Sequence, residues 1–174
     1  MAIVIRKERQ RFLPSPEGRR VSTPQRFMKV EITIAALEEK FIIRNLLELC
    51  QHDSSEFTSQ NIGDSGLFDY PYLDHYWTDQ NRYPFLIRVE HKLAGFVLVQ
   101  KIDEPAMYSL TELFILRKYR QQGLGEVVAH QIFDMFPGRW RVRQEIENDR
   151  TQSFWRKVIA RYTNNRYQET KDKV

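Results

Sequence analysis

Apolar and polar positions along the chain follow two periods. Stretches that alternate apolar with polar residues, or run through β-branched and aromatic ones, predict strands at 28–35, 83–90, 93–101, 107–117 and 139–146, with a short one at 166–170. Stretches with apolar residues three or four positions apart predict helices at 36–51, 123–136 and 148–162. Two residues, His91 and Lys92, separate two of the strands, which indicates a hairpin. We therefore expect one α/β domain with a single mixed sheet and flanking helices.

Two of the predicted helices carry an apolar stripe that would face a core. In the first helix the stripe consists of Leu37, Phe41, Leu46 and Cys50. In the second it consists of Leu124, Val128, Ile132 and Phe136. The third helix follows Asn148, a residue type that favours the N-cap position.

The first 27 residues show neither period and contain three prolines. Residues 1–28 hold seven Lys/Arg against two Asp/Glu, residues 29–138 hold ten against sixteen, and residues 139–174 hold ten against five. Basic ends can attract nucleic acid or anionic surfaces without specificity. We expect residues 1–27 to be a basic, flexible, solvated extension without specific nucleic-acid binding, and residues 28–174 to form the domain.

Composition restricts the class of protein further. With 174 residues, 41% of them apolar, the chain can bury one sizeable core. No apolar run approaches the ~20 residues needed to cross a bilayer, so no membrane partner is expected. The single cysteine, Cys50, agrees with a reducing compartment and a cytoplasmic location. The four histidines lack metal-ligand spacing, so we expect no metal.

The stretch between the strand at 107–117 and the next helix reads Arg-Lys-Tyr-Arg-Gln-Gln-Gly-Leu-Gly. Unpaired N–H groups at a helix start suit a phosphate, and glycines at 123 and 125 would let its oxygens approach the backbone. A P-loop would need Gly-Lys-Ser/Thr, and a dinucleotide fingerprint would need a third glycine where this chain has Val128. The pattern therefore predicts a phosphate-binding loop that is neither a P-loop nor a dinucleotide-binding loop.

This stretch resembles the acyl-CoA pyrophosphate loop of the GNAT superfamily of N-acetyltransferases, Arg/Gln-x-x-Gly-x-Gly/Ala. The matching residues are Arg120, Gln121, Gln122, Gly123, Leu124 and Gly125. The element order from Lys29 to Tyr162 is also similar, and so is a last helix that opens with Asn148 and carries Phe-Trp-Arg-Lys. The resemblance implies a GNAT fold and an acetyl-CoA-dependent N-acetyltransferase.

The family holds acetyl-CoA as cosubstrate in the wedge between two splayed central strands. The resemblance implies that backbone groups of Phe114 and Ile115 pair with its pantetheine arm, and that Asn148 and Trp155 contribute to its site. It also implies that an amine acceptor attacks the thioester directly, with Glu112 as the base. Strict strand alternation would place Glu112 on one face with Tyr108, Leu110, Phe114 and Leu116, where desolvation makes a carboxylate a stronger base.

Two departures from the family pattern keep an alternative open. Trp155 stands where many members have a tyrosine that protonates the leaving thiolate, so water or another hydroxyl, such as that of Tyr108, would replace it. The family has two strands after the last helix, yet about ten residues remain here. The final strand could be short, absent or contributed by a partner in a homodimer. The alternative function is an acyl-CoA-binding module without catalysis.

The acceptor side is predicted from the residues between Arg44 and Arg82. This stretch contains no lysine or arginine but seven carboxylates and six aromatic residues. We expect an acidic, aromatic pocket that attracts a cationic amine, such as a polyamine, an aminoglycoside-like molecule or a peptide amine. The residues expected to line it are Asp69, Tyr72, Asp74, Tyr76 and Asp79. A solvated acidic loop remains the alternative.

Overall fold

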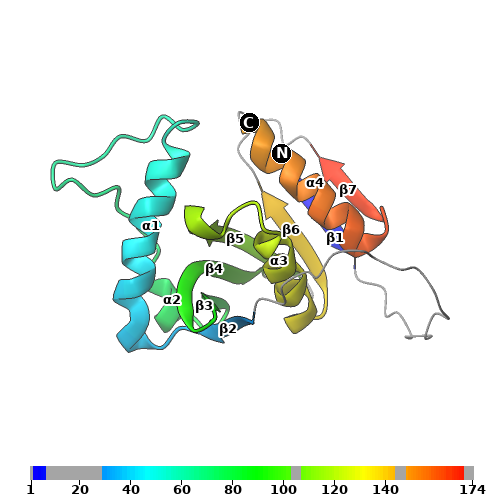
Figure 1. Ribbon diagram of the computed structural model, residues 1–174, viewed down its shortest axis with the longest axis horizontal. Helices are drawn as coiled ribbons and strands as arrows, with labels where there is room; N and C mark the ends of the chain where they lie inside the picture. Colours follow the sequence, from blue (N-terminus) through cyan, green and yellow to red (C-terminus); the bar gives the residue numbers. More distant parts are fainter. Residues whose placement is uncertain (1, 7–28, 103–106, 144–147, 171–174) are drawn as a thin grey trace.

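The computed structural model describes residues 2–6, 29–102, 107–143 and 148–170, which fold around one seven-stranded sheet (Figure 1). Its strands are β1 (Ala2–Arg6), β2 (Val30–Ile34), β3 (Arg82–Val89), β4 (Lys92–Ile102), β5 (Met107–Ile115), β6 (Arg139–Arg143) and β7 (Tyr167–Thr170). The order across the sheet is β2-β3-β4-β5-β6-β1-β7. Only β5 and β6 pair in parallel, so the sheet is mixed as predicted.

Helices cover both faces of the sheet. They are α1 (Lys40–Ser54), α2 (His75–Thr78), α3 (Leu124–Met135) and α4 (Asp149–Thr163), with single 3-10 turns η1 (Leu37–Glu39) and η2 (Arg117–Tyr119). In Figure 1, α1 and α4 lie at opposite ends of the molecule, with α3 between them. None of the helices in the described ranges is long and apolar enough to span a bilayer.

Two apolar cores lie on the two faces of the sheet. The core on one face combines α3, α4 and β1 with residues of the central strands, among them Ile5, Val99, Leu110, Ile132 and Trp140. The core on the opposite face combines α1 and α2 with other residues of the same strands, among them Ile43, Leu47, Tyr76, Leu98 and Phe114. The two sets of strand residues show which side chain faces which layer.

The predicted stripe of α3 is confirmed, whereas that of α1 is wrong in part. Leu124, Val128 and Ile132 are buried against the sheet. On the first helix Leu37 and Phe41 are instead 60% and 62% exposed. The core of α1 is formed by Ile43, Leu46 and Leu47, because this helix packs on the sheet through a face rotated from the predicted one.

The N-terminal residues contradict the expected flexible extension. Ala2–Arg6 form β1, and Ile3 and Ile5 are fully buried in the core beside α3 and α4. The alternating apolar positions of this short segment were too few to establish a strand period, and the partners that complete it are far away in the chain. Residues 7–27, the remainder of the expected extension apart from Met1, lie outside the described part.

Strand β1 also explains how the sheet is completed although few residues follow α4. It pairs antiparallel with β6, where Ile3 lies opposite Val142, and antiparallel with β7, where Ile3 lies opposite Glu169. The predicted last strand exists as β7, and the strand between it and β6 comes from the N-terminus of the same chain. The sheet therefore reaches seven strands without a strand from a partner.

The predicted hairpin between β3 and β4 is confirmed, with a turn one residue earlier than expected. Glu90 and His91 both have positive φ, 49° and 63°, as a two-residue hairpin turn requires. Farther along β4, a Cβ on Gly95 would lie 2.0 Å from the Phe114 carbonyl oxygen. Glycine here lets β4 and β5 approach closely just before the loop that follows β5.

Candidate active site

The parallel pairing of β5 and β6 ends partway along β5. Their paired residues run from Met107 opposite Arg139 to Leu110 opposite Val142. Strand β5 continues to Ile115, so in the described part residues 112–115 are paired on the β4 side alone. Backbone groups on the other side of such a strand are available to an extended ligand.

A register shift in β5 reverses the faces that alternation predicts. Leu98 of β4 lies opposite Glu112, whereas Val99 lies opposite Leu110, so Thr111 is an extra residue in β5. A β-bulge of this kind turns the following side chains to the other face. Tyr108 therefore lies on the α3 and α4 side, while Glu112 lies on the α1 and α2 side.

The expected grouping of Tyr108 with Glu112 is thus wrong. The Tyr108 ring packs 5.0 Å from Phe136 and 5.4 Å from Trp140, between centroids. Leu110 is buried in the same core, whereas Phe114 is buried on the face of Glu112. The structure does not bring the Tyr108 hydroxyl and the Glu112 carboxylate together.

Glu112 is half-buried between α1 and the segment before α2. The Cys50 thiol of α1 lies 3.9 Å from Glu112 Oε2. Burial, and then the negative charge of Glu112, raise the pKa of the Cys50 thiol and the Tyr70 hydroxyl. The Tyr76 hydroxyl lies 2.7 Å from Thr111 Oγ1, and its pKa is raised chiefly by burial. The carboxylate therefore lies among groups that keep their protons at neutral pH.

The loop after β5 has the backbone expected of an anion cradle. Gln121 and Gly123 have φ of 60° and 78°, and Gly123 is the N-cap of α3. A Cβ on Gly123 would meet nothing within 4 Å, so space is open at the helix start. The first N–H groups of α3 and its dipole favour a phosphate there. Leu124, by contrast, is a core residue, 1% exposed.

Gly125 serves packing as well as the loop. A Cβ there would lie 3.1 Å from the Phe154 ring of α4, so the glycine lets the first turn of α3 touch α4. The Gln122 side chain donates to the Lys118 carbonyl at 2.9 Å and closes the loop on itself.

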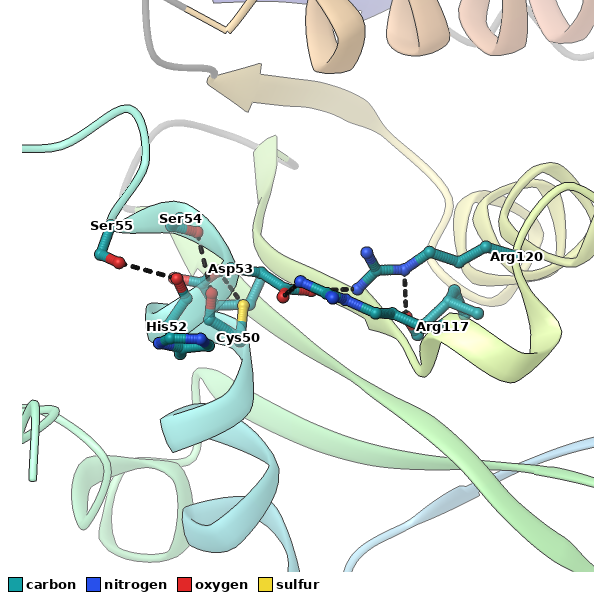
Figure 2. A network of polar contacts seen from close by, with 9 residues as sticks. Cys50, His52, Asp53, Ser54, Ser55, Arg117 and Arg120 are labelled. Atoms are coloured by element: carbon teal, nitrogen blue, oxygen red, sulfur yellow. Dashed lines mark hydrogen bonds and ion pairs between the residues drawn. The ribbon is translucent and has the colours of Figure 1, made fainter.

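Arg120 is held by groups from both sides of the loop. Its Nε donates to the Ile115 carbonyl at 2.7 Å, and its guanidinium lies 5.4 Å from the centroid of the Phe114 ring. Figure 2 shows Arg120 and Arg117 reaching toward Asp53 at the end of α1, each at 2.5 Å from one carboxylate oxygen. These contacts connect the predicted phosphate loop to α1.

The two arginines also set the ionisation of Asp53. Burial is the largest influence on the pKa of Asp53 and favours the protonated form, but hydrogen bonds from Arg117 and Arg120 outweigh it and lower the pKa. Asp53 is therefore charged at neutral pH and orients both guanidinium groups. Sequence reasoning had placed Asp53 only in an acidic stretch, because its partners lie more than sixty residues away.

The two site residues expected from α4 have structural contacts. Asn148 is the predicted N-cap, and its side chain accepts a hydrogen bond from the Thr151 N–H at 3.0 Å. Trp155 is buried in the core beside α3 and packs edge-on against Phe154, with centroids 5.1 Å apart. Trp155 therefore has a packing role in the core, and its indole N–H is not an acid that could replace the family's tyrosine.

The five residues expected to form an acidic pocket are dispersed. Asp69 and Tyr72 are exposed. Asp74 is paired with Lys40 at 2.6 Å, and Asp79 accepts from the Asn81 N–H at 2.9 Å. Of the five, Tyr76 is the one that contacts β5 on the face of Glu112. The structure does not gather the carboxylates around that glutamate.

A cavity of about 280 Å³ opens on the face of Glu112 across β4, β5 and β6. Its lining residues are Gln100, Ile102, Ser109, Leu110, Thr111, Arg141 and Arg143. The sequence could have indicated the arginines, because they alternate in β6 with the buried Trp140 and Val142 and must face the opposite side. No cluster of His, Cys, Asp and Glu suited to a metal occurs within the described ranges.

Comparison with known proteins agrees with this geometry. A family model for the acetyltransferase (GNAT) family matches residues 46–159. A crystal structure of a possible acetyltransferase from Clostridium difficile 630 has a TM-score of 0.64 at 12% identity, covering 83% of this chain and 95% of that one. No curated protein sequence matches the chain.

Two further solved structures share the fold. The PaiA N-acetyltransferase of Thermoplasma acidophilum, in complex with coenzyme A, has a TM-score of 0.54 at 16% identity over 75% of this chain and 88% of that one. An aminoglycoside antibiotic 6'-N-acetyltransferase of Acinetobacter haemolyticus has a TM-score of 0.55 at 10% identity over 83% and 94%. At these identities the likeness shows the fold alone.

Proposed function

The chain belongs to the acetyltransferase (GNAT) family, and on that premise we propose that it transfers an acetyl group from acetyl-CoA to a primary amine by direct attack. The observation that carries the proposal is the position of Glu112. Glu112 lies on β5 two residues beyond Leu110, the last residue of β5 that pairs with β6. A thioester laid along residues 112–115 would meet an amine beside this carboxylate.

The pyrophosphate of acetyl-CoA would bind at the start of α3. Gly123 leaves open space there as the N-cap of α3, and the first N–H groups of a helix favour a phosphate. Arg120 supplies positive charge next to this position, oriented by Asp53. The PaiA structure in complex with coenzyme A supports this ligand class for the fold.

The chemical step requires two contributions from the chain, a proton acceptor and donors for the oxyanion. The amine nitrogen attacks the thioester carbon, the C–S bond breaks, and the amine's proton passes to Glu112. Backbone N–H groups on the open side of residues 112–115 donate to the developing oxyanion. The thiolate leaves as the anion, because the pKa of a thiol is only about 8.5. Glu112 then releases the amine's proton to solvent water, from which the thiolate is protonated. Neither Trp155 nor Tyr108 is needed for this step.

The test of this proposal is thiol release from acetyl-CoA with a panel of primary amines. Glu112→Gln should lower kcat by on the order of 10²-fold, because the amine's proton loses its acceptor, with the Kd for CoA unchanged in calorimetry. Glu38→Gln, a carboxylate of η1 outside the site, is the matched control and should keep wild-type turnover.

Two outcomes would contradict the proposal in different ways. Wild-type turnover of Glu112→Gln across pH would remove Glu112 from the mechanism. Tight CoA binding without turnover of any amine would favour an acyl-CoA-binding module instead.

A further inference from the structure

A polar row crosses the sheet on the face of Glu112, and its member in β5 lies three residues before this glutamate. Strand pairing places Arg82 opposite Gln100, Gln100 opposite Ser109, and Ser109 opposite Arg141. These four residues come from β3, β4, β5 and β6 and face the α1 side. The last three line the cavity, and Arg143 lines it next to Arg141. The cavity therefore carries guanidinium groups along β6 and hydrogen-bonding groups on its floor.

Arg82 adds a third cation at the other end of this row. Its side chain is 16% exposed, and its guanidinium lies 5.3 Å from the centroid of the Tyr76 ring. Its Nε atom is buried without a hydrogen-bond partner in the part of the chain that the structure describes. The nearest ion-pairing oxygen, Asp79 Oδ2, lies 3.4 Å away. Buried guanidinium groups usually satisfy each N–H, so this atom has unused donor capacity.

The charges on this face differ from those expected of a pocket for polycations. Among the carboxylates of the acidic stretch, Asp74 pairs with Lys40 and Asp53 pairs with Arg117 and Arg120. Asp79 reaches the polar row, at its Arg82 end. Among the residues that the structure describes, Glu112 is the carboxylate that directly follows a lining residue of the cavity, Thr111, in β5. An acceptor with several positive charges would place the others against Arg141 and Arg143, at a cost in Coulomb energy.

We infer that the acceptor carries an anionic group in addition to its amine, and that the arginine-lined cavity binds this group while the amine faces Glu112. The inference rests on the proposed acetyl transfer and specifies its substrate class. Carboxylate and phosphate both match the planar donors of arginine and the hydroxyl and amide groups of the floor. The arginines act in binding and orientation, and the chemical step is unchanged.

The test uses amines that differ only in the anionic group. Lysine and cadaverine form one pair, which differs by a carboxylate, and phosphoethanolamine and ethanolamine form another, which differs by a phosphate. We expect kcat/KM for the anionic member of at least one pair to exceed that of its partner by about tenfold or more, equivalent to about 1.4 kcal/mol. The pair that shows the preference identifies the kind of anion.

Arginine variants assign the preference to the cavity. Arg143→Gln and Arg141→Gln should each lower the anionic-to-neutral ratio of kcat/KM by several-fold, mainly through KM. Arg139→Gln removes the same charge from the same strand outside the cavity lining and should leave the ratio unchanged. Thermal unfolding of each variant checks that it folds.

The outcomes separate this inference from the proposed function. Equal or better use of cadaverine and ethanolamine overturns the anionic acceptor while acetyl transfer stands. Calorimetric binding of an anionic amine, weakened by Arg143→Gln, without any thiol release would support the cavity and overturn the transfer reaction. If the anionic amines neither bind nor react, the inference is wrong.

Discussion

The two parts of the sheet on either side of the β5–β6 junction are assembled differently. Strands β2 to β5 lie in the sheet in their chain order and pair antiparallel with their neighbours in the sequence. Beyond the junction, the N-terminal strand β1 lies between β6 and β7, which both come from the last forty residues of the chain. Local pattern predicted every strand of the first part, whereas in the second part it missed β1, whose pairing depends on contacts across almost the whole sequence.

The candidate site lies where these two parts meet. Glu112 belongs to the first part, and the cavity arginines Arg141 and Arg143 belong to the second. Helix α3 follows the first part and α4 follows β6, and the two helices touch through Gly125 and Phe154. A change that loosens the second part should therefore disturb the acceptor side more than it disturbs the backbone of β5.

The largest effect is expected for the N-terminal strand. Ile5→Ala should lower the free energy of unfolding by about 2–5 kcal/mol, because Ile5 is fully buried between β6 and β7. Val4→Ala, on the partly exposed face of the same strand, is the matched control and should cost far less. Urea unfolding measures both. Equally small losses of unfolding free energy in both variants would show that β1 adds little to stability. The contrast between the two parts of the sheet would then not hold.

A smaller effect is expected where α3 meets α4. Gly125→Ala should destabilise the fold by about 1–3 kcal/mol, because the new Cβ would lie 3.1 Å from the Phe154 ring. Combining it with Phe154→Leu should recover part of the loss, since the smaller side chain gives room. Unfolding free energies of both single variants and the double variant measure the coupling. Simple additivity would mean that this contact does not join the two parts.

The ion pairs of Asp53 should give a pH-dependent effect of about 1–2 kcal/mol. The pKa of Asp53 is lowered in the folded state, so its contribution is present above the unfolded value of about 3.9 and is lost as pH falls through the lower folded value. Asp53→Asn should therefore be less stable than wild type at pH 7, with the difference shrinking below about pH 4. Urea midpoints at both pH values measure it, and a difference that persists at low pH would contradict an ionic origin.

The smallest effect is expected for the acidic stretch. Asp74 is exposed and pairs with Lys40, so Asp74→Asn should change the KM of the best amine acceptor by less than about twofold. Tyr76→Phe removes the hydroxyl that contacts Thr111 and should change this KM more. Steady-state kinetics compares them. A strong effect of Asp74→Asn would restore the acidic pocket predicted from the sequence.

Two parts of the candidate site differed in how far the sequence could predict them. The loop from Arg120 to Gly125 was predictable because its requirements are local: a left-handed glycine, an N-cap and a helix start within six residues. The surroundings of Glu112 were not, because one extra residue at Thr111 reverses every later side chain of β5. Nothing in the alternation of Tyr108 to Leu116 marks where such a bulge occurs.

By itself the sequence determined the strands from residue 29 onward, the three long helices, and the left-handed glycine and helix start of the loop after β5, but not the short α2. These features depend on periods and turn residues that act over a few positions. The tertiary structure decided that Ala2–Arg6 complete the sheet, that Arg82, Ser109 and Arg141 share a row, and that Asp53 holds Arg120. Such pairings depend on which distant surfaces bury the most apolar area together. The residues of a short segment do not specify the distant strand or helix with which that segment packs.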